Sequence, residues 1–186
     1  MKTACLASLL ALAGVPAMAT DYSPAEAADR AAIITVIDAV GFYADQNQWD
    51  RVAEQFDPEG VTLDYRSYAT ASAGTAEAPA PQSPESVVEA WQGVLPGYDY
   101  TQHIIANYQV EIDGDSATAL SNVHATHVLG GDAWVFLGDY AHHLTRTADG
   151  WKIDRMTANL RAELGDRGLH ARATARVAAR NGRSAN

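Results

Sequence analysis

The chain has 186 residues and a formal net charge of −10 at pH 7, with 23 acidic residues against 13 lysines and arginines. This length suits a single domain with its own hydrophobic core. The acidic charge argues against nucleic acid as a partner, because binding to phosphate backbones depends on basic side chains.

Residues 1–19 have the features of a secretory signal peptide. Lys2 supplies the positive start, residues 4–15 are apolar, and Ala17-Met18-Ala19 has small residues where signal peptidases cut. The apolar stretch is too short to cross a bilayer stably, so we expect no membrane insertion. An N-terminal anchor or an ordinary helix is the alternative. Cleavage would start the mature chain at Thr20, secreted or periplasmic, and would remove Cys5, the only cysteine, which excludes disulfides and thiolate chemistry.

The first half of the mature chain is predicted to be mainly helical. Ser23-Pro24-Ala25-Glu26 has the capping serine, the early proline and the acidic residue of a helix start. Apolar residues then recur at helical spacing as far as Tyr43. Further along, the patterns predict a short helix over 49–56, a strand over 61–65, a surface loop over 68–82 and a helix from 84 to about 95.

The second half is predicted to form an antiparallel sheet. Four long strands are expected at 102–112, 117–128, 134–145 and 151–160, separated by turn sequences that each contain glycine and aspartate. Helices followed by an antiparallel sheet indicate the α+β class. A curved sheet wrapped on the N-terminal helices would form a cone with one open end, which is a natural pocket.

The C-terminal segment has a composition of its own. Residues 167–186 contain five arginines and no acidic residue. As a helix, this segment would align Arg172, Arg176 and Arg180 in one stripe. One interpretation is that the stripe contacts a membrane surface or an acidic partner. The other, which we favour, is that the segment is a frayed end or a helix that lies on the protein's own acidic body. We therefore divide the chain into a signal peptide (1–19), one domain (20–166) and an arginine-rich tail (167–186).

The histidines in the predicted strands do not form a metal-binding pattern. His124 and His127 are three residues apart on one strand, so their side chains face opposite sides of the sheet. His142 and His143 are neighbours and also face opposite sides. Neither pair can chelate one ion as a unit, so we predict no metal site.

Asp45 and His103 are candidates for a catalytic pair. Asp45 ends the first predicted helix, and His103 precedes an apolar-rich strand. A carboxylate beside an imidazole fixes its tautomer and stabilises the imidazolium that forms when it takes a proton. Spacing alone leaves a capping aspartate and a core histidine as the alternative.

Several stretches resemble scytalone dehydratases. The first predicted helix, to Asp45, also resembles that of hexachlorocyclohexane dehydrochlorinases. Both groups belong to the SnoaL-like branch of the nuclear transport factor 2-like superfamily, an α+β cone, and the resemblance spans roughly residues 25–162. The stretches that carry it are Phe42-Tyr43-Ala44-Asp45, Trp49-Asp50-Arg51, Leu63-Asp64-Tyr65-Arg66-Ser67 and Thr101-Gln102-His103.

The resemblance implies roles for four side chains. His103 matches the general base and Asp45 its orienting partner. Tyr65 matches a tyrosine that polarises the substrate carbonyl through water. His127 matches a second pocket histidine that would protonate the departing hydroxyl, once a one-residue gap near Asp113 is allowed.

The residues that recognise substrate in those families are changed here. Ala44 stands where scytalone dehydratases have a tyrosine, with Tyr43 adjacent, and Asp139 and Ala141 stand in place of a serine and an asparagine. The dehydrochlorinase lysine falls on Val40. Tyr43 and Asp139 are thus candidate substrate contacts. Candidate apolar walls are Trp91, Trp134, Phe136 and Tyr140.

The resemblance implies a cofactor-independent lyase of the dehydratase type, or an isomerase, acting on a small, cyclic, apolar substrate. A hydrolase using the same base is a further possibility. The alternative from another class is a non-catalytic ligand-binding or assembly module, because one fold hosts many functions. Homo-oligomers are common for this fold.

Overall fold

The computed structural model describes residues 22–65 and 79–184, so the predicted signal peptide and most of the predicted loop at 68–82 lie outside the described residues. Helices come first and the sheet follows, with one more helix at the end. In chain order the elements are α1 (Pro24–Asp45), α2 (Trp49–Ala53), β1 (Thr62–Asp64), α4 (Pro84–Gln92), the 3-10 helix η2 (Leu95–Gly97), β2 (Tyr100–Asp113), β3 (Ser116–Leu129), β4 (Asp132–Thr147), β5 (Gly150–Gly165) and α5 (Leu169–Ser184).

Helix α1 begins and ends as its sequence predicts. The Ser23 side chain caps the helix by accepting a hydrogen bond from the Glu26 backbone N–H at 3.1 Å. The buried residues repeat at helical spacing, from Ile33 and Ile37 onward, and form a stripe that packs under the sheet. Asp45 is the last helical residue, which fixes its side chain at the end of that stripe.

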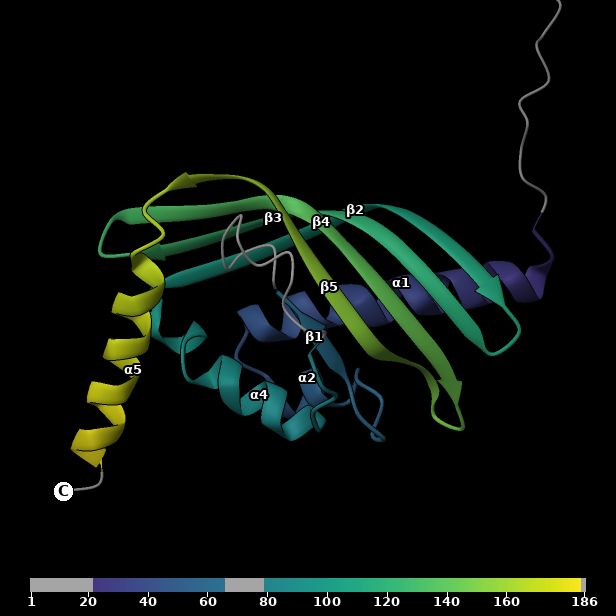
Figure 1. Cartoon of the computed structure of the whole chain (residues 1–186), viewed down its shortest axis with the longest axis horizontal. Coiled ribbons are helices and arrows are strands. Elements are labelled where there is room, and N and C mark those ends of the chain that lie inside the picture. The colour runs from purple at the N-terminus through teal and green to yellow at the C-terminus, as the bar shows by residue number, and fades with distance from the viewer. Residues whose placement is uncertain (1–21, 66–78, 185–186) are drawn as a thin grey trace, which may run out of the picture.

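The sheet has the strand order β1-β5-β4-β3-β2, and β2 to β5 pair antiparallel with their chain neighbours (Figure 1). All four predicted long strands are present, each somewhat longer than predicted. The antiparallel prediction is wrong for the first strand, because β1 pairs parallel with β5 through Leu63 and Met156. The sheet is therefore mixed.

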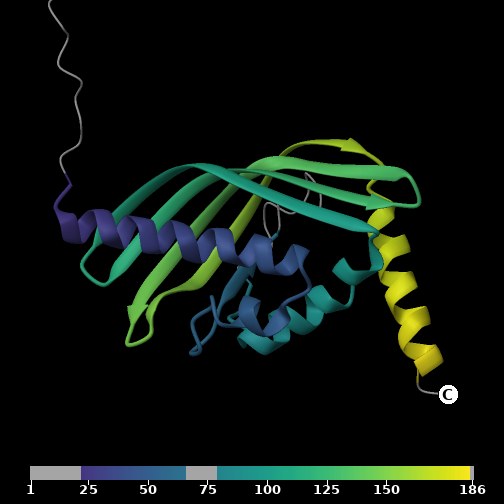
Figure 2. The same cartoon turned by 180° about the vertical axis from the view of Figure 1, so that it is seen from behind.

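The sheet curves around α1, which lies across its concave side (Figure 2). Two single-residue irregularities in β5 contribute, because the β4–β5 register skips Asp154 and Arg161. The sheet does not close into a barrel, so one end of the concave side stays open. This arrangement confirms the predicted α+β cone.

Two short helices depart from their predicted bounds. Helix α2 ends at Ala53, because Phe56 leaves the helix to pair with Ile153 of β5. Helix α4 ends at Gln92, and the chain then turns into η2 instead of continuing to Leu95. No helix within the described ranges is both long and apolar enough to span a membrane.

The arginine-rich tail forms helix α5, which stands at one end of the sheet (Figure 1). Leu169 and Ala173 are fully buried, so the helix packs on the body of the protein. Arg172 pairs with Asp132 at 3.1 Å and Arg176 with Asp99 at 2.5 Å. These contacts agree with the favoured prediction of a helix on the protein's own acidic residues.

Candidate active site

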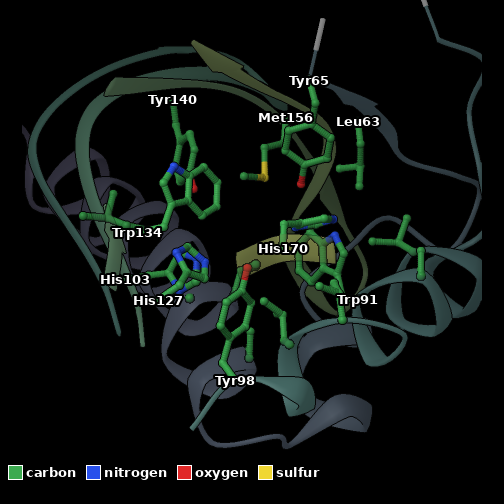
Figure 3. Close-up of a pocket in the computed structure, with 18 of the residues that line it drawn as sticks. Leu63, Tyr65, Trp91, Tyr98, His103, His127, Trp134, Tyr140, Met156 and His170 are labelled. Atoms are coloured by element: carbon green, nitrogen blue, oxygen red, sulfur yellow. The ribbon is translucent and has the colours of Figure 1, made fainter. Parts of the chain in front are cut away.

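The concave side of the sheet encloses a cavity of about 720 Å³. Its walls come from α1, α4, η2, α5 and the inward faces of the strands, and most lining side chains are apolar (Figure 3). A volume of this size accommodates a drug-sized molecule. Because most of the lining is apolar, the few polar side chains at the cavity are the candidates for chemistry.

Asp45 and His103 are in direct contact at the cavity wall. The Asp45 Oδ2 atom accepts the His103 backbone N–H at 2.7 Å, and Oδ1 lies 2.8 Å from the ring Nδ1. Oδ1 also accepts the hydroxyl of Thr101 at 2.8 Å. A carboxylate can only accept these bonds, so Nδ1 carries a proton and the lone pair of a neutral His103 sits on Nε2.

The contact is shielded from solvent. The side chains of Asp45 and His103 are 10% and 15% exposed. Burial raises the pKa of Asp45, but the hydrogen bond and charge of His103 and the bond from Thr101 outweigh burial and lower it overall. Asp45 therefore stays ionised and able to stabilise a proton on His103.

His127 lies beside this pair. Its ring meets the His103 ring edge-on, with 5.5 Å between centroids, and stacks on Trp134 at 4.9 Å. Burial, followed by the charge of His103, lowers the pKa of His127 to about 3. A ring that stays neutral at pH 7 is a hydrogen-bond donor or acceptor. It is not the charged acid that the predicted protonating role requires.

Tyr98 completes this end of the cavity. Its ring lies 4.9 Å from that of His127, and Figure 3 shows the two side by side. Burial raises the pKa of Tyr98 to about 12, so its hydroxyl stays protonated. Within the part of the chain that the structure describes, neither the Tyr98 hydroxyl nor the His127 Nδ1 has a hydrogen-bond partner.

Several predicted pocket residues do line the cavity. Tyr65 follows β1 and extends its side chain toward Met156, and Trp91 projects from α4 (Figure 3). Trp134 and Tyr140 line the cavity from β4. The aromatic walls inferred from the sequence are therefore present, with one exception.

That exception is Phe136, which is fully buried and stacked against Tyr140, outside the cavity lining.

Two residues predicted to contact the substrate do not line the cavity. Tyr43 lies outside the cavity lining, with its ring under the Arg51 guanidinium at 3.9 Å. Asp139 belongs to the opposite face of β4, where it accepts a hydrogen bond from Arg161 at 2.5 Å.

Five polar residues at the cavity were not predicted: Gln82, Tyr98, His142, Arg167 and His170. Tyr98 follows the irregular η2 segment, for which the sequence carries no distinct signal. His142 lies two residues from Tyr140 on β4, so strand alternation does place both on one face. His170 lines the cavity from α5, in the segment predicted to be a tail outside the domain.

The outer face of the sheet has a second histidine network. His143 Nδ1 lies 2.7 Å from Asp154 Oδ1, and its Nε2 lies 2.9 Å from the Ser116 hydroxyl. Asp154 also accepts the hydroxyl of Thr145 at 2.6 Å. The opposite orientations predicted for His142 and His143 are thus present, and so are those of His124 and His127. Among residues 22–65 and 79–184, no three acidic, histidine or cysteine side chains are placed to hold a metal ion.

Comparisons with known proteins identify the fold. The model of the SnoaL-like domain family matches residues 25–157. The solved structure of the Kfla4162 protein from Kribbella flavida is 25% identical, with a TM-score of 0.67, and the match covers 78% of this chain and 97% of that one. No curated protein matches the sequence significantly.

Two further solved structures share the fold at lower identity. A candidate scytalone dehydratase from Novosphingobium aromaticivorans DSM 12444 is 15% identical, with a TM-score of 0.61 and coverage of 75% of this chain and 89% of that one. Hexachlorocyclohexane dehydrochlorinase LinA-type3 from Novosphingobium barchaimii LL02 is 18% identical, with a TM-score of 0.61 and coverage of 77% and 94%. Helix α5 lies beyond the residues that match the family model.

Proposed function

Because the chain belongs to the SnoaL-like family, we propose that it is a cofactor-independent lyase or isomerase that removes a proton from carbon. The observation that carries the proposal is the 2.8 Å contact between Asp45 and His103 at the wall of an apolar cavity. Two of the similar structures bear names that denote elimination of water or of hydrogen chloride.

In the proposed reaction, Nε2 of His103 takes a proton from the substrate carbon. The electron pair of the broken C–H bond either expels a leaving group from the neighbouring carbon or moves into a shifted double bond. The imidazolium then gives its proton to the departing group or to the far carbon of the shifted double bond, which returns His103 to the neutral form. The Asp45 carboxylate stabilises the imidazolium through the Nδ1–H bond. A largely apolar, ring-containing substrate suits the aromatic walls formed by Trp91, Trp134 and Tyr140.

The developing negative charge on the substrate needs hydrogen-bond donors. Tyr65 lines the cavity, and Tyr98 keeps its proton because burial raises its pKa. Neutral His127 keeps its one ring proton on the nitrogen bonded to the Trp134 backbone, so its unpaired Nδ1 is an acceptor. We assign Tyr65 and Tyr98 to stabilising the oxyanion or the leaving group, since fixed donors in a water-poor site are effective there.

The proposal is tested with nitrobenzisoxazole, a probe whose ring opens when a base removes its single carbon-bound proton. The wild-type protein should open the probe faster than buffer does, with saturation kinetics. His103→Ala should lower kcat/KM at least tenfold, because a positioned general base contributes roughly a hundredfold or more. His124→Ala is the matched control, since His124 is an exposed histidine on the outer face of β3.

Equal rates for the wild-type protein and His103→Ala would refute the proposed base. If both proteins also bound an apolar dye equally well, the chain would be a ligand-binding module. Circular dichroism and the melting temperature establish that each variant is folded.

A further inference from the structure

We propose that His142 forms a second polar subsite in the cavity, which binds an uncharged hydroxyl or carbonyl group at the far end of an elongated, otherwise apolar substrate. This inference deepens the proposed function and rests on it only in placing the reacting carbon at His103. No contact described above assigns a partner to His142.

His142 is buried against the cavity without a polar partner. Its side chain lies on the inward face of β4, with only 4% of the residue exposed, and it lines the same cavity as His103. Its Nδ1 has no hydrogen-bond partner among the described residues. Buried polar atoms are almost always paired, so an unpaired one on a ring that lines a cavity indicates a partner that the protein itself does not supply.

Ser121 supports the proposed subsite at His142. It is 3% exposed, and its hydroxyl also has no partner within the described ranges. The β3–β4 register pairs Ser121 with Tyr140 and Ala119 with His142. Ser121 and His142 are therefore diagonal neighbours on the inward face, at a usual spacing of about 7–8 Å, although Ser121 itself lies outside the cavity lining.

The subsite is well separated from the proposed base. His103 is level with Ala125 on β3 and, through it, with Phe136 on β4. His142 lies six residues farther along β4, where the concave side brings side chains together: the Phe136 and Tyr140 rings are 6.3 Å apart and the Tyr140 and His142 rings 5.7 Å. Because β2 and β4 are two strands apart, about 10 Å across the sheet at the usual strand spacing, a single ring held at His103 does not reach His142. A substrate that contacts both must be elongated.

The apolar lining of the cavity determines the rest of the substrate. Ile37 and Val40 of α1 line the same cavity, and so does Met156 of β5, which pairs with His142 in the sheet. A charged group is disfavoured at the far end, because moving it out of water next to apolar walls is costly. Burial lowers the pKa of His142 to about 4, so the ring is neutral and can either donate to a carbonyl or accept from a hydroxyl.

Two probes of equal size test the subsite: para-nonylphenol, and a para-(hydroxyoctyl)phenol in which a hydroxyl replaces the terminal methyl group. Trp91 and Trp134 line the cavity, so tryptophan fluorescence reports binding. We expect the affinity of the hydroxylated probe relative to its methyl counterpart to fall about fivefold or more in His142→Leu, the usual worth of one hydrogen bond. His142→Asn keeps a polar atom near the Nδ1 position and should retain most of this preference.

His124→Leu is the matched control and should bind as the wild type does. An equal probe ratio in wild type and His142→Leu would overturn the inference, and so would failure of the wild type to bind either probe. If His142→Leu does not fold, His142→Gln replaces it. Glutamine places its amide nearer the Nε2 position, so equal ratios in His142→Asn and His142→Gln would then overturn the inference.

The subsite and the proposed function fail separately. If the wild type opens nitrobenzisoxazole but His142→Leu has the same probe ratio as the wild type, the subsite alone fails. If His142→Leu loses the preference that the wild type shows, but the wild type does not open nitrobenzisoxazole, the proposed function alone fails. The melting temperature adds a readout without ligand: His142→Leu should melt no lower than the wild type, because it removes an unpaired buried polar atom.

Discussion

The carboxylate of Asp45 holds His103 at two points, the backbone N–H at 2.7 Å and the ring Nδ1 at 2.8 Å. The backbone contact fixes where β2 runs relative to the end of α1, and the ring contact fixes the tautomer. The same aspartate thus positions the strand and orients the proposed base.

Asp45 and His103 should act as a unit in opening nitrobenzisoxazole. Asp45→Asn should remove most of the activity, because the amide neither fixes the tautomer nor stabilises the imidazolium. The double variant should be scarcely slower than His103→Ala alone, since the aspartate acts through the imidazole. The kcat/KM values of the four proteins form the test. Losses that simply multiply, in variants with unchanged melting temperatures, would show that the two residues act independently.

Stability should decrease as the pH falls below about 6.5. Burial lowers the pKa of His142 to about 4 and, as the largest cause, that of His127 to about 3, from an ordinary value of 6.5. Between these values the unfolded chain binds protons that the folded protein does not, so each histidine lowers the free energy of unfolding by up to about 1.4 kcal/mol per pH unit. Urea unfolding at a series of pH values measures the slope. His142→Leu should have a shallower slope, and an identical slope would contradict the burial of a neutral His142.

Helix α5 should contribute to the core. Leu169 is fully buried, whereas Leu164, at the end of β5, is 60% exposed. Leu169→Ala should lower the free energy of unfolding by about 2–5 kcal/mol, while Leu164→Ala should change it by less than about 0.5 kcal/mol. Urea unfolding of both variants provides the comparison. Equal small effects would mean that α5 is peripheral.

The packing of α5 on η2 should tolerate no side chain at Gly97. A Cβ atom there would lie 2.1 Å from the carbonyl oxygen of Ala173, so Gly97→Ala must push the two helices apart. We expect a loss of about 1–3 kcal/mol or more. Gly182→Ala is the matched control, because that position has open space and alanine favours a helix by up to about 1 kcal/mol. Melting temperatures should therefore move in opposite directions.

The mature chain should begin at Thr20. The small residues at Ala17 and Ala19 follow the apolar stretch at the spacing that signal peptidases use. Intact-mass measurement of the protein exported by a bacterial host tests this start. A product that retains Lys2 would contradict export by this route.

The regular elements were predictable because their signals are local. Hydrophobic periodicity and turn residues located α1 and the four long strands without knowledge of the fold. The parallel pairing of Leu63 with Met156 was not predictable in this way, because the two residues are far apart in the chain.

The candidate site was predictable only where a local signal and the resemblance agreed. Asp45 and His103 satisfied both, and the structure brings them into contact. Asp139 was inferred from resemblance alone, although alternation from Tyr140 places it on the opposite face of β4. Alternation from the same tyrosine points inward to His142. The period of the strand was a better guide to the cavity than the matched position.

The outer face of the sheet gives the protein an internal standard for spectroscopy. His143 and Asp154 repeat the contact between an Nδ1 and a carboxylate at 2.7 Å, but the His143 side chain is 38% exposed. One nitrogen-15 spectrum of the folded protein therefore contains two Nδ1 protons that each contact a carboxylate, one on the buried His103 and one on the more exposed His143. The proton on His143 should exchange rapidly with water and that on His103 slowly. Any ligand that fills the cavity should shift the His103 signal and leave the His143 signal in place.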